Sequence, residues 1–380
     1  MDYIKLCDVC DFQGGSQPPK DEWSFIPKDG YIRMLQIRDF TQGERVIPEY
    51  IKLTNTTKIC EADDILIARY GASLGKTLTG LSGAYNVAIM RTIPNTELLE
   101  KKYLYYYLKA PAFQCFLLKI GNRAAQAGFN KNDLQELLIP CVSREQQEEV
   151  VCILEKVDTL ICARKQQLQK LDDLVKSRFI EMFGNMVYNP NDWEKVNLGS
   201  VCDVRDGTHD SPKYFPEGYP LVTSKNVTSG RIDFTDCSLI CKEDYDKINE
   251  RSRVDFGDIL MPMIGTVGKP VIVDVDADFA IKNVALIKFY EDSTVINIFV
   301  RALLQSDYFD RAVISKIRGG TQKFISLSDI RKLEIYLPPM DTQNQFAVFV
   351  EQTDKSKAAI QKALDETQML FDSLMQKYFG

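Results

Sequence analysis

The sequence VVCILEKVDTLICARKQQLQKLDDLVKSRFIEMF, from Val150 to Phe183, carries a sustained heptad pattern. Apolar residues recur in it at alternating four- and three-residue steps: Val150, Leu154, Val157, Ile161, Leu168, Leu171, Val175 and Met182. Arg164 and Arg178 fill the two positions that the pattern leaves vacant. A heptad of this length predicts a long helix with an apolar seam for a partner helix.

The partner is predicted near the end of the chain, where the same pattern returns. The equivalent positions hold Phe346, Val350, Ile360, Leu364, Phe371, Leu374 and Tyr378, with Thr353, Lys357 and Thr367 as polar interruptions. Two helices of matching register predict a coiled coil with each other, in which the polar positions should weaken the coil or fix its register. Each helix of roughly 40 residues would be on the order of 60 Å long.

An alternative is that each helix packs only on its own domain, as ordinary core. No Gly or Pro occurs between Ser143 and Phe183 or between Asp341 and Phe379, so nothing turns either helix back. Ser143 and Asp341 are typical of N-capped helix starts that follow a proline stop. These observations favour the coiled coil.

The rest of the chain is a duplication, with a shift of about 190 to 198 residues between the halves. The matches keep their order: Leu6, Val9, Cys10, Asp11 and Gly15 against Leu198, Val201, Cys202, Asp203 and Gly207; Gly30-Tyr31 against Gly218-Tyr219; Arg38-Asp39 against Lys225-Asn226; Asp64-Ile65-Leu66 against Asp258-Ile259-Leu260; Asn86-Val87-Ala88 against Asn283-Val284-Ala285; and Gln126, Asp133 and Pro140 against Gln322, Asp329 and Pro338. Short runs of Val, Ile, Phe and Tyr between Gly, Asn and Asp predict a mixed α/β domain in each half. We therefore expect domains at residues 1–142 and 185–340 and helices at 143–184 and 341–380.

Composition places few limits on function. With 380 residues, 45% hydrophobic and 26% charged, the chain is typical of a soluble protein of two domains. Neither an export signal nor a run of about 18 apolar residues is evident, which predicts a cytoplasmic protein without membrane contact. Cys7 and Cys10 form a C-x-x-C, but a second pair is absent and His209 is the only histidine, so we expect no metal site.

The net charge of −6 hides two local basic segments. Between residues 101 and 132 the basic residues are Lys101, Lys102, Lys109, Lys119, Arg123 and Lys131, and no acidic residue occurs. Between residues 311 and 328 they are Arg311, Lys316, Arg318 and Lys323, again without an acid. Basic faces on an acidic chain indicate a protein that binds a polyanion at defined places.

These features together resemble the specificity subunit of type I restriction-modification systems, and the resemblance covers essentially the whole chain. Two recognition domains share a Leu-x-x-Val-Cys-Asp segment, an Asp-Ile-Leu run before paired glycines, and a Pro-to-Gln helix start at Pro140 to Gln147 and at Pro338 to Gln345. The resemblance implies that each domain reads one half of a split DNA site and that the helices form an antiparallel coiled coil between them. It also implies docking of two methyltransferase subunits, and through them of restriction (translocase) subunits, with S-adenosylmethionine, ATP and Mg bound by those partners and no cofactor in this chain.

Candidate DNA-binding residues lie at matching places in the two halves. In the basic segments they are Arg123, Gln126 and Lys131 with Arg318, Gln322 and Lys323, because Arg suits guanine, Gln adenine and Lys phosphate. The alternative is a solvated basic loop. Arg38, Lys225 and Asn226 are further candidates that could equally pin a turn.

The glycine-rich segment Gly71 to Thr77 resembles a phosphate-binding loop but is one residue too short between its glycines, and its repeat at Gly265 to Lys269 ends in Pro270. We expect a glycine turn that approaches DNA phosphate with Lys76 and Lys269 as counter-charges, or a plain structural turn. The tyrosines at 103, 105, 106 and 107 are interpreted as helix packing.

No catalytic residues are predicted, so the chain is expected not to be an enzyme. Two alternatives stay open. One is an undetected nuclease or methyltransferase site that uses Asp255 and Asp258, and the other is an adaptor that binds proteins through the helices, with DNA incidental. Because the halves differ outside the shared framework, an asymmetric bipartite DNA target is predicted.

Overall fold

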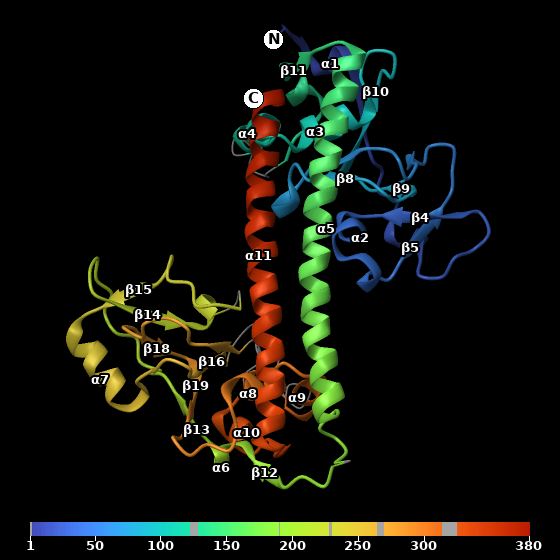
Figure 1. Cartoon of the computed structure of the whole chain (residues 1–380). Helices are drawn as coiled ribbons and strands as arrows, with labels where there is room; N and C mark the ends of the chain where they lie inside the picture. Colours follow the sequence, from blue (N-terminus) through green and yellow to red (C-terminus); the bar gives the residue numbers. More distant parts are fainter. Residues whose placement is uncertain (1, 122–127, 190, 228–229, 264–269, 314–324) are drawn as a thin grey trace. The chain divides into compact units, whose positions relative to one another are not determined.

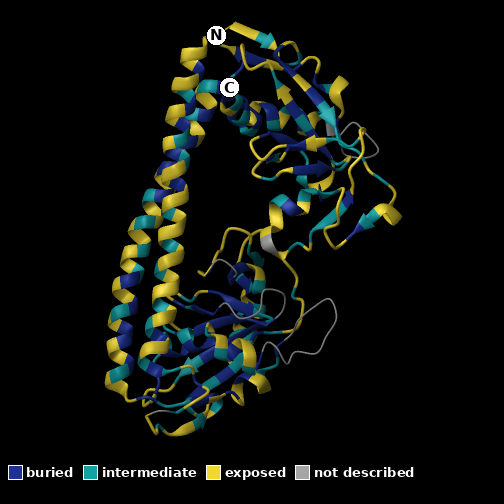
Figure 2. Ribbon diagram, turned by 90° about the vertical axis from the view of Figure 1, so that its right-hand side faces the viewer, coloured by how far each residue is buried: buried dark blue, intermediate teal, exposed yellow. Residues whose placement is uncertain are grey.

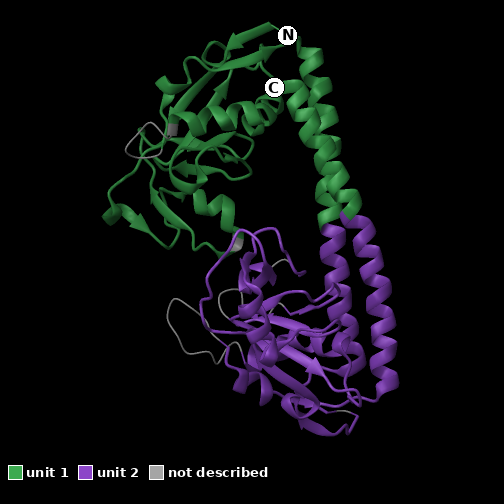
Figure 3. Ribbon diagram, turned by 90° about the vertical axis from the view of Figure 1, so that its left-hand side faces the viewer, with its two compact units in different colours: residues 1–165, 362–380 green, residues 166–361 purple. Residues whose placement is uncertain are grey.

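The computed structural model describes residues 2–121, 128–189, 191–227, 230–263, 270–313 and 325–380. It divides into two compact units, which Figure 3 shows in different colours. Unit 1 comprises residues 1–165 and 362–380, and unit 2 comprises residues 166–361. Both units contain part of each of the two long helices, α5 (Arg144–Phe183) and α11 (Met340–Phe379), which Figure 1 labels.

Unit 1 contains three sheets. A two-stranded sheet joins β1 (Asp2–Lys5) and β11 (Leu138–Cys141), and a four-stranded sheet has the order β2 (Cys10–Gly14), β10 (Ile89–Pro94), β7 (Leu66–Ala68), β8 (Thr77–Leu78). A five-stranded sheet has the order β3 (Trp23–Ser24), β5 (Glu49–Lys52), β4 (Tyr31–Leu35), β9 (Gly83–Tyr85), β6 (Ile59–Cys60). The helices are α1 (Leu6–Val9), η1 (Lys20–Glu22), α2 (Ile37–Gln42), η2 (Gly43–Arg45), η3 (Gly71–Ser73), α3 (Lys101–Lys109), α4 (Pro111–Gly121) and η4 (Lys131–Leu134).

Unit 2 has sheets of two, four and three strands. They are β12 (Lys195–Asn197) with β20 (Glu334–Tyr336); β13 (Cys202–Asp206), β19 (Val284–Phe289), β16 (Ile259–Pro262), β17 (Val271–Ile272); and β15 (Ser238–Ile240), β14 (Tyr219–Thr223), β18 (Ala280–Lys282). The helices are α6 (Leu198–Val201), η5 (Ser224–Val227), α7 (Lys242–Ser252), α8 (Asn297–Leu304), α9 (Asp307–Ala312) and α10 (Leu327–Arg331).

The duplication predicted from the sequence is present in the topology of the two units. The order β2-β10-β7-β8 in unit 1 is repeated as β13-β19-β16-β17 in unit 2. Each unit also contains one parallel pair, β4 with β9 and β14 with β18, beside the antiparallel ladders. The fold is therefore two copies of one α/β (α+β) frame, each continued into a long helix.

One detail of the predicted repeat is wrong. Pro140 lies in β11 opposite Tyr3, and the matching position in β20, opposite Lys195, holds Tyr336 and not Pro338. The glutamine that repeats Gln147 is correspondingly Gln343 and not Gln345. Spacing from a proline mislocated the helix start because the connection between strand and helix differs in length between the halves.

The two glutamines that do correspond anchor the long helices to their units. Gln147 accepts a hydrogen bond from the Glu100 N–H at 2.8 Å and donates to the Leu98 carbonyl at 2.9 Å. Gln343 accepts from the Ile296 N–H at 3.0 Å and donates to the Thr294 carbonyl at 2.9 Å. Both side chains are buried, so each bond also satisfies backbone groups that cannot reach water.

The helices α5 and α11 run antiparallel within each unit. In unit 2, Phe183 near the end of α5 packs on Phe346 near the start of α11, and Asp172 pairs with Lys357 at 2.7 Å. In unit 1, Arg164 donates to the Ala363 carbonyl. The seam residues predicted from the heptad are all buried or half-buried, while Figure 2 shows much of the remaining surface of both helices as exposed.

The polar residues of the second heptad are accommodated within the seam. Thr353 and Thr367 are buried, and their hydroxyls donate to the carbonyls of Phe349 at 2.9 Å and Ala363 at 2.7 Å. Lys357 reaches Asp172 of the facing helix. That ion pair favours one register of the two helices over its neighbours.

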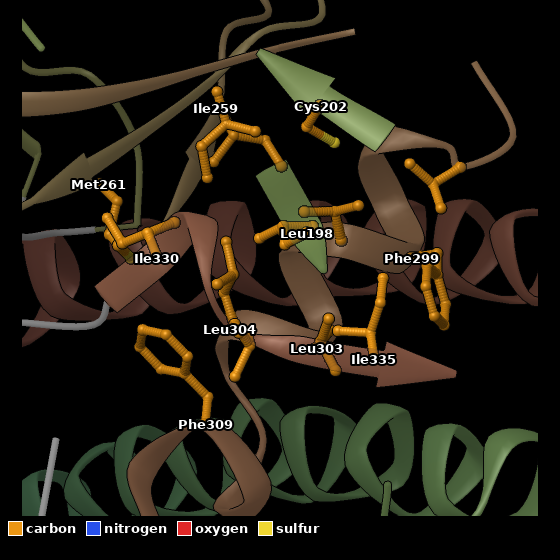
Figure 4. Packing of buried hydrophobic residues seen from close by; sticks show 14 of the residues in the cluster. Leu198, Cys202, Ile259, Met261, Phe299, Leu303, Leu304, Phe309, Ile330 and Ile335 are labelled. Carbon is orange, nitrogen blue, oxygen red and sulfur yellow. The ribbon is translucent and has the colours of Figure 1, made fainter. Parts of the chain in front are cut away.

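The core of unit 2 lies between the four-stranded sheet, the short helices and the ends of α5 and α11. Figure 4 shows part of it, with these residues labelled: Leu198, Cys202, Ile259, Met261, Phe299, Leu303, Leu304, Phe309, Ile330 and Ile335. In unit 1, Tyr103, Tyr106 and Tyr107 of α3 are buried, and Tyr103 and Tyr107 contact Phe379 of α11. The tyrosine cluster is therefore packing, as the sequence indicated.

Candidate nucleic-acid interface

Arg69 draws together three segments of unit 1 that lie far apart in the sequence. Its Nε donates to the Phe129 carbonyl at 3.1 Å, and one terminal nitrogen donates to the Val87 carbonyl at 3.1 Å. The next residue, Tyr70, is bridged to Gly128. The glycine turn after β7, the loop before β10 and the described end of the first basic segment therefore meet at one surface.

The same two segments meet in unit 2. Met263, which precedes the second glycine-rich segment, accepts a hydrogen bond at 3.0 Å from the N–H of Ile325, which follows the second basic segment. Both residues are buried. The candidates Lys269, Arg318, Gln322 and Lys323, like Arg123 and Gln126 in unit 1, lie outside the described residues.

Lys76 stands at the end of a tight turn. Gly71 and Gly75 adopt positive φ angles of 69° and 80°, and the Ala68 carbonyl accepts from the Gly75 N–H at 2.9 Å. Such angles favour glycine, which explains the repeated glycines without a nucleotide. Lys76 itself is exposed and has no ion-pair partner within the described part of the chain.

Lys131 is exposed but paired. Its ammonium group forms an ion pair with Asp11, another residue of the repeated framework. The hydrogen bond from Lys131 holds the pKa of Asp11 below its ordinary value, and that from Asp11 raises the pKa of Lys131. Exposed pairs of this kind contribute at most about 1 kcal/mol, so a phosphate could replace the carboxylate at small cost.

Arg38 and the residue after it have different roles. Arg38 is exposed on α2 and forms an ion pair with Glu49. Asp39 is buried, accepts from the Gln36 N–H at 2.9 Å and pairs with Arg33 at 2.8 Å. Asp39 therefore caps α2 and stabilises the turn, while Arg38 faces solvent.

The repeat of this pair in unit 2 follows the same division. Lys225 is exposed in η5. Asn226 is buried, accepts from the Thr223 N–H at 3.0 Å and donates to the Asp233 carbonyl at 3.1 Å. Because its amide is occupied within the unit, we leave Asn226 out of the interface proposed below.

His209 is part of a polar network at the end of β13. Its Nε2 lies 2.7 Å from Asp206, and its Nδ1 lies 2.8 Å from the Asn283 side-chain oxygen. Arg251 of α7 also pairs with Asp206. Hydrogen bonds to Asn283 and then to Asp206 raise the pKa of His209 above its ordinary 6.5.

Two framework glycines position the loops that carry these groups. A Cβ on Gly15 would lie 2.1 Å from the Asn86 carbonyl oxygen, and one on Gly207 would lie 2.1 Å from the Ile281 carbonyl oxygen. Only glycine permits this close approach of the loop to the strand. The loop after β2 and the loop after β13 are therefore held against the strand ends that bear Asn86 and Asn283.

Sequence reasoning identified Asn86 and Asn283 as a repeat but not as site residues, and it missed Arg69 and Tyr70 altogether. The repeated Asn-Val-Ala segment was the available signal for the asparagines. No pattern in the sequence marks Arg69, because its partners come from distant segments.

The carboxylates that an undetected nuclease site would need are used structurally. Asp258 is buried, accepts from the Asp255 N–H at 2.7 Å and pairs with Lys288 at 2.6 Å. In unit 1, Asp64 accepts from the Glu61 N–H at 2.9 Å and pairs with Arg91 at 2.8 Å. Among the described residues, no group of three or more His, Cys, Asp or Glu side chains is placed to hold a metal ion, and no helix is long and apolar enough to cross a bilayer.

Comparison with known proteins identifies the family. The model of the type I restriction modification DNA specificity domain matches residues 1–172 and again residues 190–367. Similar curated proteins include the type I restriction enzyme MjaVIII specificity subunit of Methanocaldococcus jannaschii, 24% identical with 88% of this chain and 84% of that protein covered. Another is the EcoBI specificity subunit of Escherichia coli, 20% identical with 80% of this chain and 72% of that protein covered.

Solved structures share the fold. A chain from a structural study of complex assembly and conformational transition in the type I R-M system superposes with a TM-score of 0.56 at 19% identity, covering 100% of this chain and 97% of that one. The S subunit of the type I system of M. genitalium gives a TM-score of 0.54 at 15% identity, covering 100% and 96%. With two matches of the family model that follow the two repeated frames, the chain belongs to the type I restriction modification DNA specificity family.

Proposed function

We propose that this chain is the sequence-specific DNA-binding subunit of a type I restriction-modification complex and that it reads an asymmetric bipartite site. The observation that carries the proposal is the duplicated frame, which the family model matches in both halves. Residues 1–142 and 185–340 would act as the two target-recognition domains. Each would read one half-site.

The asymmetry of the target follows from the way the two units differ around the shared frame. Beside its parallel pair, unit 1 has a five-stranded sheet, whereas unit 2 has three strands and packs α7 against β18. Surfaces that differ in this way present different side chains to DNA. The two half-sites should therefore differ in sequence.

The long helices, at residues 143–184 and 341–380, would serve as the spacer and as the docking surface for partners. Two 40-residue helices of about 60 Å fix a separation, and a fixed separation sets the number of unread base pairs. Ile153, Leu160 and Leu174 lie exposed on α5 at heptad spacing, which suits helical partners. We assign these surfaces to two methyltransferase subunits, through which restriction subunits join.

The chemistry would belong to those partners. In this proposal the chain has no catalytic site and binds no cofactor, while S-adenosylmethionine, ATP and Mg are bound by the methyltransferase and restriction subunits. The complex would act on DNA in the cytoplasm. Occupied carboxylates at Asp64 and Asp258 support a structural rather than a catalytic role for the repeated aspartates.

The residues proposed to contact DNA are those that remain available after the internal pairs are assigned. Lys76 is exposed and unpaired by any described residue, while Arg38 and Lys131 are exposed in surface ion pairs and Lys225 is exposed in η5. We retain Arg123, Gln126, Lys269, Arg318, Gln322 and Lys323 as predictions. Phosphate contacts from such residues would set position, and base contacts from others would set specificity.

Neutralising Lys76 tests the DNA interface directly. Lys76→Gln in the chain assembled with its methyltransferase subunits should weaken binding to the split site several-fold and reduce the salt slope of the affinity by about one. Fluorescence anisotropy across a salt series measures both quantities. Lys102→Gln is the matched control, because Lys102 is equally charged and exposed but pairs with Glu155 of α5. Equal slopes for the two variants would contradict the placement of Lys76, and a flat slope in the parent complex would favour a protein-binding adaptor.

A further inference from the structure

Both units place an asparagine at the same point of the frame, with one end of its amide anchored. Asn86 directly follows β9, and Asn283 directly follows β18, where each chain passes from the parallel pair to the central strand. The Asn86 side-chain oxygen accepts from the Ala88 N–H at 3.2 Å, and that of Asn283 lies 2.8 Å from His209 Nδ1. Both residues are half-buried, and neither side-chain NH₂ has a hydrogen-bond partner among the described residues. Each amide thus has one end anchored inside its unit and the other end open.

The two anchors differ in chemistry. A backbone N–H only donates, so Ala88 holds the oxygen of Asn86 inward and its NH₂ outward at every pH. A histidine nitrogen donates when the ring is protonated and accepts when the ring is neutral and keeps its proton on the other nitrogen. Asp206, 2.7 Å from Nε2, accepts that other proton. The anchor of Asn283 therefore changes from donor to acceptor when His209 loses a proton.

The backbone of Asn283 is held in place, so the change can act only on its amide. Its φ of 54° lies in the left-handed region. The Asn283 N–H donates to the Thr208 carbonyl at 3.2 Å, and its carbonyl accepts from the Ser224 hydroxyl at 3.1 Å. With the main chain fixed on both sides, the side chain can respond only by turning its amide over.

The charges around His209 are of both signs. Asp206 on β13 faces its Nε2, and Arg251 on α7 shares that carboxylate and opposes the positive charge of the ring. Asp244 and Lys247 of α7 line the groove beside the ring. Lys282, which precedes Asn283, donates to the Ser211 hydroxyl at 2.7 Å. The net effect is a pKa raised above 6.5, so the ring titrates close to neutral pH.

We propose that Asn283 is a base-reading residue of unit 2 and that His209 is a positioning residue that decides which end of the Asn283 amide meets DNA. With His209 protonated, the amide oxygen is turned inward and the NH₂ faces acceptors such as guanine O6 and N7 or thymine O4. With His209 neutral, the NH₂ is turned inward and the oxygen faces donors such as adenine N6 or cytosine N4. Asn86 in unit 1 shows its NH₂ in both conditions. The inference rests on the proposed function and concerns one position of the half-site that unit 2 reads.

Selection of bound sequences from a random DNA pool at about pH 5.5 and about pH 8.5 tests the proposal on the assembled complex. We expect one position of one half-site to change its preferred base, with preferences of roughly 5- to 100-fold, while the other half-site stays the same. His209→Gln should make the preference independent of pH. Asn283→Gly should abolish it at both values, and glycine tolerates the φ of this position, so the loop is not strained.

The outcomes separate this inference from the function on which it rests. A split site with identical base preferences at both pH values overturns the inference alone, as does a pH-dependent preference that persists in Asn283→Gly. Absence of any split site at either pH overturns the proposed function as well. Because His209 is the only histidine of the chain, the single imidazole signal of histidine-labelled protein gives its titration directly. A pKa that Asn283→Gly leaves unchanged would also contradict the proposed contact.

Discussion

Phe183→Ala is expected to lower the free energy of unfolding of unit 2 by about 3–5 kcal/mol. Phe183 is 1% exposed and packs its ring on Phe179, Phe299 and Phe346, with centroid separations of 5.0, 4.9 and 5.3 Å. These rings come from α5, α8 and α11. Removing the side chain leaves a cavity where the long helices join the core of unit 2, and rigid helices cannot collapse into it.

Tryptophan fluorescence during urea unfolding measures this loss. The chain has two tryptophans, and Trp193 lies 6.3 Å from Phe183, so a Trp23→Phe background reports on unit 2 alone. Ile180→Ala on the same helix is the control, because Ile180 is 51% exposed and should lose less than about 1 kcal/mol. A loss below about 1 kcal/mol for Phe183→Ala would show that the aromatic cluster does not hold the helices to unit 2.

Gln343→Ala is expected to destabilise unit 2 by about 3 kcal/mol. The truncation would leave the Ile296 N–H and the Thr294 carbonyl buried without partners, and each such group costs about 1–3 kcal/mol. The start of α11 would then detach from the loop before α8. The same Trp193 signal and the hydrogen-exchange protection of Ile296 measure the two effects.

The control for this prediction is the same substitution two residues later. Gln345 is exposed, and Gln345→Ala should change the free energy of unfolding by less than about 0.5 kcal/mol. Equal effects at the two positions would contradict the assignment of Gln343 as the residue that repeats Gln147. They would instead support the spacing from Pro338 that the sequence suggested.

The parts of the fold that could be predicted are those that periodicity encodes. A heptad gives the position of a helix and the face it buries, and Leu154, Val157 and Phe346 are buried accordingly. The duplication was visible because turn glycines and capping residues repeat in order. Gly15 and Gly207 repeat since a Cβ would clash with a strand backbone at each. These constraints are local, and a single sequence displays them.

The site was harder to predict because repetition marks the frame more strongly than the reader. Asp39 and Asn226 were matched as polar partners of possible DNA contact, yet each accepts a hydrogen bond from the N–H three residues earlier and is buried. Asp64 and Asp258 do the same. Short polar residues recur at such turns because they satisfy backbone donors. Arg69 and His209 depend on contacts between distant segments, which no spacing reveals.

Methylation sequencing tests the central claim most directly. A host without DNA methylation would express this chain with its methyltransferase subunit, and the modified adenines of the genome would be read. The account predicts methyladenine at one asymmetric motif of two half-sites with a fixed gap. It also predicts that exchanging residues 21–140 for those of a related subunit changes one half-site and leaves the other half-site and the gap unchanged. Methylation without a split motif, or a motif that the exchange leaves intact, would contradict the account.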